Sequence, residues 1–219
     1  SLCQTGDGLV DHGLVDAGGD ILGTGTLIDQ RLHVTFCKHA AAGSDGIGAL
    51  RLLGIRDVIE VSSGVKTGLN IRSEQPRQVG SDRVAAAVAA RAKGKLPCVA
   101  VTLGTATTFT ALDGSGALVG SAITTGVQLS LLALREQAAQ LPAVAIDAKD
   151  EGILARNTVD AMRVGAVYGA ASLVDGMVER FAEALGETPY VVLTGELAPL
   201  VTPYLRIPFE YDESLVLDG

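Results

Sequence analysis

The feature that most constrains the fold of this chain is a succession of short strands and then helices that occurs twice. Between Leu9 and Ile28 apolar runs alternate with Asp and Gly, and Asp16–Asp20 has the composition of a hairpin turn. Later strands are predicted at Cys98–Leu103, Phe109–Leu112 and Ala117–Thr124. Two β-meanders that each lead into helices indicate a duplicated α/β lobe, and the cleft between two such lobes is a natural place for a ligand.

The segments between the two meanders supply the remaining early elements. We expect a strand at His33–Phe36, a short helix at Gly46–Leu53 and a strand at Val58–Val61. A further helix is predicted from Ser81 to Gly94, because Ser81 can cap its start and Gly94 can end it. The first half of the chain is therefore predicted to contain a meander followed by alternating helices and strands.

The longest predicted helix runs from about Thr158 to Leu185, with Asn157 as its cap. One stripe along it consists of small residues: Gly165, Gly169, Ser172 and Gly176. Glycine costs roughly 1 kcal/mol relative to alanine inside a helix, so this stripe needs a packing reason. Two explanations are open, which are close packing against a helix of the same chain and a contact across a two-fold dimer axis.

The composition excludes several classes of protein and partner. The chain has 219 residues and a formal net charge of -8, and such a surface repels the phosphate backbone of nucleic acids. No apolar run is long enough to cross a membrane, and residues 1–7 lack the pattern of a signal peptide. The cysteines and histidines lack metal-ligand spacing. We therefore expect a cytoplasmic protein that holds any phosphate ligand in a local pocket.

Two short segments could carry chemistry. The run GTATT at residues 104–108 stands at a predicted turn, where amides and hydroxyls can point at phosphate oxygens. Its alternative is an ordinary turn and strand composition. Asp82 and Arg83 combine a carboxylate that can accept a proton from an alcohol with a guanidinium that can hold an anion. Their alternative is an ordinary helix start in which the acid matches the helix dipole, and Thr158 has the same two explanations.

Six motifs, taken together and in order, closely resemble those of type III pantothenate kinases. They are SGVKTGL at 63–69, VGSDR at 79–83, LGTATTF at 103–109, RNTVDAM at 156–162, VYGAASLVDGMVER at 167–180 and TGELAPL at 194–200. The resemblance implies the actin-like and hexokinase-like ATPase fold, in which two ribonuclease-H-like lobes each contain a mixed sheet with a β-meander and packed helices. The implied lobes are 1–94 and 95–219, the second with a dimerisation helix at about 158–185. Since only Asp29–Arg31 stand where the family has a helix, the first lobe is expected to be shortened.

The resemblance also implies an activity and a set of site residues. Type III pantothenate kinases phosphorylate pantothenate with ATP at the entry to coenzyme A synthesis, and they use Mg²⁺ with a monovalent cation, K⁺ or NH₄⁺. Asp82 corresponds to the general base for the pantothenate hydroxyl. Further substrate contacts are implied at Gly80, Ser81, Arg83 and Thr158, and contacts with ATP at Gly6, Asp7, Gly104, Thr105, Thr107 and Gly195.

The three ATP motifs of the family differ in this sequence. In the first phosphate loop, Gln4 stands where family members have an aspartate that helps to hold the metal. In the second phosphate loop, Thr102 replaces an aspartate associated with the cation and the phosphates. In the adenosine loop, Glu196 replaces one of two paired glycines. Because Mg²⁺ is usually held by one or two carboxylates and phosphoryl transfer depends on that ion, these changes predict weak nucleotide binding.

These differences predict a catalytically degenerate paralogue, a pseudoenzyme that keeps the fold and the homodimer. Its expected role is binding or regulation, with pantothenate or a similar small acid as the ligand. The alternative is an active ATP-dependent pantothenate kinase with rearranged metal ligands, in which Asp7 or Asp11 has taken over metal binding. Neither alternative includes a nucleic acid or membrane partner.

Overall fold

The computed structural model describes the backbone of Asp11–Val15, Ile21–Ile28 and Arg31–His33, and residues 66–138, 140–146 and 152–219 with their side chains. The hairpin turn predicted at 16–20, the helix predicted at 46–53 and the strand predicted at 58–61 lie outside the described residues. The residues described with their side chains therefore all lie from residue 66 onward.

The predicted first meander is present. Strands β1 (Asp11–Val15), β2 (Ile21–Ile28) and β3 (Arg31–His33) form an antiparallel sheet in the order β1-β2-β3. Leu14 pairs with Gly23, and the register shifts before Val15. The strand predicted at 33–36 begins earlier than expected, at Arg31, and its predicted residues after His33 are not described.

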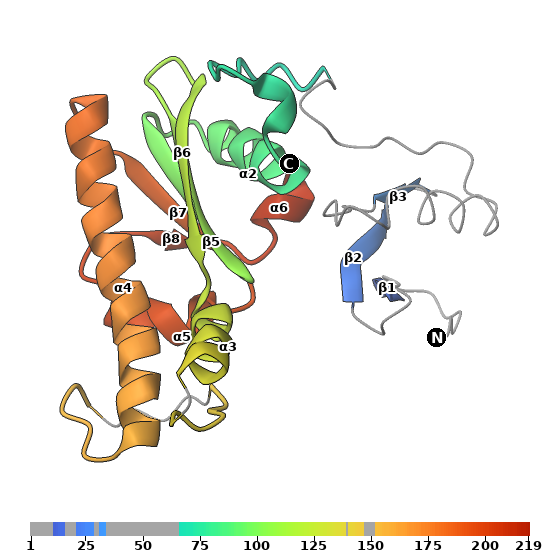
Figure 1. Ribbon diagram of the computed structural model, residues 1–219. Coiled ribbons are helices and arrows are strands. Elements are labelled where there is room, and N and C mark those ends of the chain that lie inside the picture. Colours follow the sequence, from blue (N-terminus) through green and yellow to red (C-terminus); the bar gives the residue numbers. More distant parts are fainter. Residues whose placement is uncertain (1–10, 16–20, 29–30, 34–65, 139, 147–151) are drawn as a thin grey trace.

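A second, mixed sheet contains the rest of the strands. They are β4 (Cys98–Leu103), β5 (Ala106–Leu112), β6 (Leu118–Thr125), β7 (Tyr190–Thr194) and β8 (Glu210–Tyr211), in the order β6-β5-β4-β7-β8. The first three form the second predicted meander, and β7 and β8 run parallel to β4 and β7 respectively. The protein is thus a mixed α/β protein, with helices on both sides of this sheet (Figure 1).

One side of the second sheet, here called the α4 face, is covered by the long helix α4 (Thr158–Leu185) and the short helix α5 (Ala198–Val201). Its apolar core includes Val99, Val101 and Phe109 from the sheet. Packing against Val174 of α4 removes these side chains from water, and apolar burial of this kind is the main force that holds the layers together.

The other side, here called the α2 face, is covered by α2 (Ser81–Ala92) and α6 (Leu215–Asp218). The alanine-rich surface of α2 packs against Cys98, Ala100 and Leu112. Small side chains on the helix allow it to lie close to the sheet. A 3-10 turn, Pro76–Gln78, comes just before α2.

The start of α2 differs from the prediction. Gly80 precedes the helix with an extended backbone, and Ser81 is already helical, so the prediction that Ser81 caps the helix is wrong. Glycine has no side chain with which to cap, and no side-chain cap bond is formed there. At the other end the helix stops at Ala92, and Gly94 has a φ of 70°, as a helix-ending glycine does.

The predicted long helix has the expected bounds, and its cap is confirmed because the Asn157 side chain accepts a hydrogen bond of 3.0 Å from the Asp160 amide. The helix α3 (Val127–Gln137), which comes before α4 in the chain, was not predicted. Only Val127 and Leu131 of α3 are buried, whereas other leucines of α3 are exposed, so the sequence lacks a clear amphipathic period there. No described helix is long and apolar enough to cross a membrane.

A charged cluster ties the end of the chain to α2. Lys93 Nζ lies 2.9 Å from Glu210 Oε1 and 2.5 Å from Asp212 Oδ2, and the Tyr190 hydroxyl donates to Glu210. The hydrogen bonds from Tyr190 and then Lys93 lower the pKa of Glu210 to about 2. The cluster therefore fixes β8 beside the end of α2.

Candidate functional site

Two of the candidate loops meet at the carboxyl ends of neighbouring parallel strands. The turn Gly104–Thr105 follows β4, and Gly195–Glu196 follows β7. The Leu197 amide donates a hydrogen bond of 3.1 Å to the Leu103 carbonyl, which holds the second loop against the end of β4. Ligands of α/β sheets commonly bind outside the carboxyl ends of such strands.

Glycine at two positions is required by the chain itself. Gly195 has a φ of 107°, and a Cβ there would lie 2.4 Å from the Leu103 carbonyl oxygen. A Cβ on Gly126, at the junction of β6 and α3, would lie 2.0 Å from the Gly104 carbonyl oxygen. At Gly104, by contrast, a Cβ would meet only an ordinary contact of 3.9 Å. Three backbone segments are therefore packed tightly together around the Gly104–Thr105 turn.

A line of hydroxyl groups crosses the sheet beside these loops. Thr194, Thr102 and Thr108 are direct cross-strand partners on β7, β4 and β5, so their side chains lie on one face. We call these three residues the threonine row. The row lies on the α2 face, because Ala100 stands two residues before Thr102 on β4 and packs in the core beneath α2. Beside the row on β6, Ile123 is 60% exposed, whereas Thr108 and Thr194 are buried.

Thr108 is the threonine of the GTATT run that shares a face with Thr102. It is 7% exposed, and among the described residues its Oγ1 is a buried side-chain atom without a hydrogen-bond partner. The neighbouring Thr107, which the resemblance implied as an ATP contact, pairs with Leu103 and lies on the α4 face at 2% exposure. The alternation of side chains along a strand was the signal that could have separated the two threonines.

The predicted substrate segment reaches the same face from the start of α2. Arg83 donates a hydrogen bond of 3.1 Å to Ser121 Oγ on β6 and one of 3.3 Å to the Gln78 carbonyl. Ser121 is the cross-strand partner of Thr110, which stands two residues, or about 7 Å, along β5 from Thr108. Arg83 is thus placed one step along the sheet from the threonine row.

Asp82 is half-buried in the first turn of α2. Its Oδ1 lies 2.5 Å from the position that a Cβ on Gly80 would occupy, so the bare backbone of Gly80 leaves space for this carboxylate. Ser81, which stands between Gly80 and Asp82 in the sequence, is buried with 8% exposure. The four predicted residues Gly80 to Arg83 therefore lie together at the start of the helix. We call these four residues the substrate corner.

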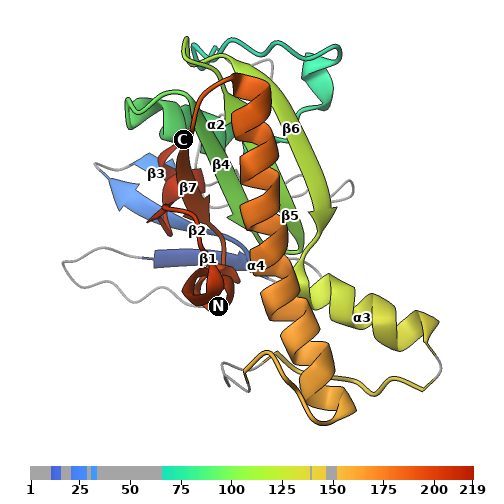
Figure 2. The same cartoon turned by 90° about the vertical axis from the view of Figure 1, so that its left-hand side faces the viewer.

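Thr158 is placed elsewhere. It begins α4, and Figures 1 and 2 both show this end of α4 at the opposite end of the molecule from α2. A single copy of the chain does not bring Thr158 beside Asp82. The remaining predicted residues, Gly6 and Asp7, lie outside the described residues, and Asp11 is described only as backbone within β1.

Comparison with known proteins identifies the family. Residues 48–180 match the profile described as type III pantothenate kinase. A type III pantothenate kinase from Pelobacter propionicus is 45% identical over 159 residues, which are 73% of this chain and 62% of that protein. The chain belongs to the type III pantothenate kinase family. A family member from Acidothermus cellulolyticus is 33% identical over 229 residues, with 98% of this chain and 89% of that protein covered.

A solved structure supports the fold. It is a crystal structure from Campylobacter jejuni described as that of a Baf family transcriptional activator, with a TM-score of 0.51 and 16% sequence identity. The similarity covers 88% of this chain and 88% of that chain. The matched part of this chain spans 62% of the length of the Pelobacter propionicus protein, which is less than two thirds.

The described loops fit the Mg-nucleotide of the type III pantothenate kinase family poorly. The ends of β4 and β7 carry threonine hydroxyls. The acidic residue in the loop after β7 is Glu196, and it is exposed. Within the described part of the chain, no three His, Cys, Asp or Glu side chains gather as a metal site. Because Mg²⁺ in such sites is held by carboxylates together with phosphates, the described residues supply little of its usual ligand set.

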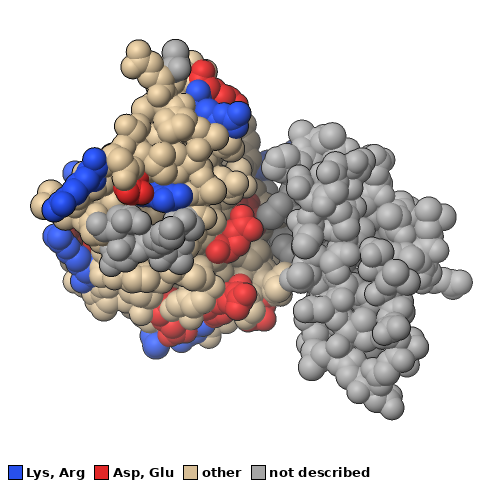
Figure 3. All heavy atoms as spheres, turned by 90° about the horizontal axis from the view of Figure 1, so that it is seen from below, with Lys and Arg blue, Asp and Glu red and all other residues tan. Residues whose placement is uncertain are grey.

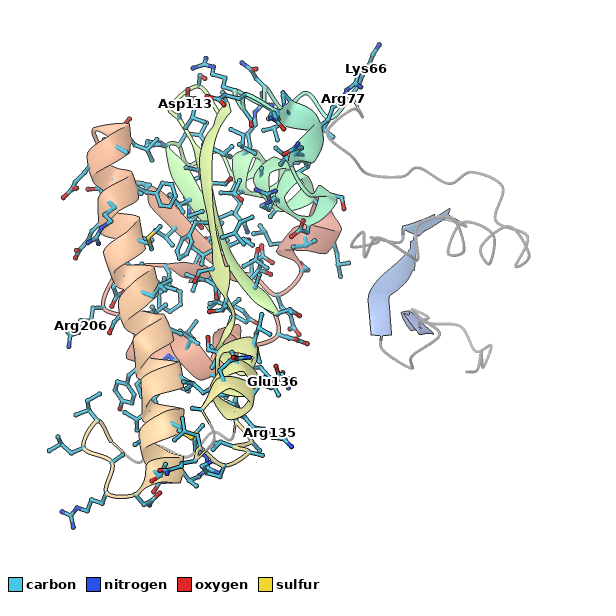
Figure 4. The ribbon with its side chains drawn as sticks, viewed as in Figure 1. Lys66, Arg77, Asp113, Arg135, Glu136 and Arg206 are labelled. Carbon is cyan, nitrogen blue, oxygen red and sulfur yellow. The ribbon has the colours of Figure 1, made fainter. Side chains whose placement is uncertain are left out.

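The described surface seen from below, where α3 and the start of α4 lie, carries charges of both signs. Seen from below, Lys and Arg side chains and Asp and Glu side chains are interspersed over the described face, without a continuous basic area (Figure 3). The charged residues Arg135 and Glu136 belong to the far end of α3 (Figure 4).

Proposed function

We propose that this chain is a pantothenate-binding, catalytically degenerate member of the type III pantothenate kinase family with a regulatory role. The reaction of the family, ATP-dependent phosphorylation of pantothenate at the entry to coenzyme A synthesis, is lost or strongly weakened. The observation that supports this proposal is the contrast between an intact corner at Gly80 to Arg83 and a threonine row without carboxylates on the same face. We place the protein in the cytoplasm, where coenzyme A precursors are made.

The substrate half of the proposal uses the corner at the start of α2. Arg83 supplies a fixed guanidinium, oriented by Ser121 and the Gln78 carbonyl, that can bind the carboxylate of pantothenate. Asp82 supplies an acceptor for the pantothenate hydroxyl, as the family's general base does. Gly80 and Ser81 complete the contact surface, so a small hydroxy acid fits this corner chemically.

The nucleotide half is where the chemistry of the family fails. At Thr102 a neutral hydroxyl cannot replace a carboxylate as an anchor for Mg²⁺ or for a monovalent cation. An ionised Glu196 about 4 Å from a phosphate would oppose binding by on the order of 1 to 4 kcal/mol. A general base contributes only about 10²-fold to 10⁴-fold and needs a bound phosphoryl donor, so Asp82 alone does not restore turnover.

A product assay tests this half directly. Pantothenate and Mg-ATP are incubated with the protein, and 4'-phosphopantothenate is quantified by mass spectrometry. We expect no product above the level given by the Asp82→Asn variant, in which the proposed base is absent. Turnover that depends on Asp82 would contradict the proposed degeneracy.

The second candidate function is an active kinase with rearranged metal ligands. The intact corner at Asp82 and Arg83 favours it, because a pure binding protein has no need of a general base. In that case Asp7 or Asp11 would hold the metal, Gly6, Gly104, Thr105, Thr107 and Gly195 would contact ATP, and K⁺ or NH₄⁺ would be required. Loss of the Asp82-dependent product in Asp7→Asn or Asp11→Asn would identify the ligand.

We also propose a homodimer formed through α4. A Cβ on Gly165 or Gly169 would meet no described atom within 4 Å, and both glycines are exposed. Packing within the described chain therefore gives no reason for these glycines, which favours a second copy as the occupant of the stripe. A partner copy could then bring its own Thr158 to the substrate corner, which a single copy does not.

Sedimentation velocity tests the dimer. Gly169→Leu puts a bulky side chain in the centre of the stripe and should convert the dimer to monomer. Ala184→Leu makes the same kind of change at an exposed position of α4 away from the stripe, and it should leave the dimer intact. An unchanged Gly169→Leu dimer would exclude α4 as the contact.

The two-lobe arrangement is part of the same proposal. The lobes are 1–94 and 95–219, with the first shortened between β2 and β3. Within the described residues, α2 belongs to the first lobe by sequence but packs against the second sheet. This crossing of α2 would place the substrate corner at the junction of the two lobes.

A further inference from the structure

We propose that a small carboxylic acid bound at Arg83 releases the exposed segment 73–78 from the start of α2, so that the position of this segment depends on whether the substrate corner is occupied. We call residues 73–78 the strap. The inference rests on the proposed function, because the ligand is the one assigned to the substrate corner. It supplies the ligand-dependent structural change that a regulatory role requires.

The strap is an exposed segment with fixed ends. Every residue from 73 to 78 is exposed, and Figures 1 and 2 show this part of the chain beyond the second sheet. Before the strap, the Arg72 amide donates a hydrogen bond of 2.8 Å to the Leu118 carbonyl, and the Arg72 guanidinium lies 3.0 Å from Asp113 Oδ2. After the strap, Val79 packs against the core beneath α2. A segment that is held at both ends and exposed between them can move while its neighbours stay folded.

A single hydrogen bond ties the strap to the side chains of α2 within the described part of the chain. The Gln78 carbonyl accepts this bond, at 3.3 Å, from Arg83 Nη2. The strap also contains a short turn of its own, in which the Gln78 amide donates to the Gln75 carbonyl at 3.0 Å. The Val79 amide donates to the Pro76 carbonyl at 3.2 Å in the same turn. Arg83 is therefore the residue through which a ligand can act on the strap.

A bound carboxylate competes for the same guanidinium. Nη1 of Arg83 donates to Ser121 Oγ at 3.1 Å and Nη2 donates to the Gln78 carbonyl, so both end nitrogens are engaged in the free protein. Carboxylates bind arginine through two parallel hydrogen bonds, and each pair of adjacent guanidinium donors includes an end nitrogen. Such an ion pair is stronger than one long bond to a neutral carbonyl. We therefore expect the guanidinium to keep its contact with Ser121 and to give up Gln78.

Hydrogen exchange of the full chain, measured by NMR, tests the release. It is compared between the free protein and the protein with pantothenate at a concentration that calorimetry shows to be saturating. We expect the amides of Gln78 and Val79 to exchange at least threefold faster with pantothenate, because a strap without its tie opens its short turn more often. The Ala117 amide, which donates to Asp113 Oδ1 in the turn before β6, should exchange at the same rate in both states. Unchanged or slower exchange of the strap in the bound protein would overturn the proposal.

Two variants test the tie without a ligand. Arg83→Ala removes the donor to Gln78, so the free variant should already show fast exchange of the strap, and pantothenate should cause no further change. Arg91→Ala is the matched control, because Arg91 on the same helix donates at 2.5 Å to the Gly68 carbonyl, which lies before the strap. Exchange of the strap should stay slow in that control.

The outcomes separate this inference from the proposed function. Slow exchange of the strap in Arg83→Ala would overturn the inference, since Arg83 would then not hold the strap. Pantothenate binding to the wild type without faster exchange would overturn the inference alone. If calorimetry detected no pantothenate binding, the proposed function would be refuted and the ligand-dependent release with it.

Discussion

The two ends of the α2 face carry different kinds of side chains. At the start of α2, charged groups are present and oriented, with Arg83 bonded to Ser121 and Asp82 fitted against Gly80. At the ends of β4 and β7, the backbone is tightly packed, and hydroxyls stand at Thr102 and Thr194. These two loops thus combine tight backbone packing with neutral side chains at the strand ends.

This comparison separates two demands on a binding site. Backbone packing at Gly126 and Gly195 is required for folding, because any side chain there collides with the Gly104–Thr105 turn or its neighbour Leu103. Charges at the loop ends serve only the ligand. The proposed loss of ATP chemistry would therefore remove acids and keep the glycines, and Gly126 and Gly195 are both present here.

The largest expected effect comes from the packed loops. Gly195→Ala forces a Cβ into the Leu103 backbone at a φ of 107°, so we expect a loss of unfolding free energy on the order of 2 to 4 kcal/mol. Gly104→Ala, where the contact is ordinary, should change stability by less than about 1 kcal/mol. Urea denaturation measures both. Equal losses would show that the difference between these two glycines is not steric.

The next effect concerns the substrate corner. Arg83→Ala removes a charged hydrogen-bond donor, which is worth about 1.5 to 3 kcal/mol, so pantothenate affinity should fall by about tenfold to a hundredfold. Arg83→Lys should recover only part of it, because lysine lacks the planar fork. Arg77→Ala, on the turn before α2 (Figure 4), serves as the control. Unchanged affinity in Arg83→Ala would remove this corner from the site.

A smaller effect is expected at the nucleotide loops. Glu196→Gln removes the charge and Glu196→Gly removes both charge and bulk. Since Glu196 is exposed, relief of repulsion should be near 1 kcal/mol, or about fivefold in Mg-ATP affinity. Pantothenate affinity should stay constant in both variants. A loss of Mg-ATP affinity in Glu196→Gln would mean that this acid holds a metal ion.

The smallest effect tests a region outside the comparison. The pKa of Glu210 is lowered to about 2 by Tyr190 and then Lys93, so its contribution to stability is present above its ordinary value and is lost as the pH falls toward 2. The urea midpoint of the wild type should therefore decline between about pH 5 and about pH 2 more than that of Glu210→Gln. If the urea midpoints of the wild type and of Glu210→Gln declined equally, Glu210 would not stabilise the fold through its contacts with Tyr190 and Lys93.

Local sequence signals predicted much of this fold. The strand Cys98–Leu103 and the helix Thr158–Leu185 were placed with their observed bounds, because a run rich in β-branched residues marks the strand and an Asn cap marks the start of the helix. Helix α3 was missed because several of its leucines face outward. Its position depends on a tertiary contact, the fit of Gly126 against the Gly104–Thr105 turn, that no local pattern encodes.

The candidate site was predictable only in part. Motifs indicated Gly80 to Arg83 and the GTATT run, and the structure places Arg83 and Thr108 on one face of the sheet. Sequence alone did not say which threonine of that run shares a face with Thr102, since this depends on the register between β4 and β5. Nor could it relate Thr158 to Asp82, because their distance depends on how α4 crosses the sheet.

Isothermal titration of the wild-type protein with pantothenate and, in a separate experiment, with Mg-ATP tests the central claim most directly. The account predicts saturable binding of pantothenate that is lost in Arg83→Ala, together with no measurable heat from Mg-ATP under the same conditions. Saturable binding of Mg-ATP with an affinity equal to or above that for pantothenate would contradict it.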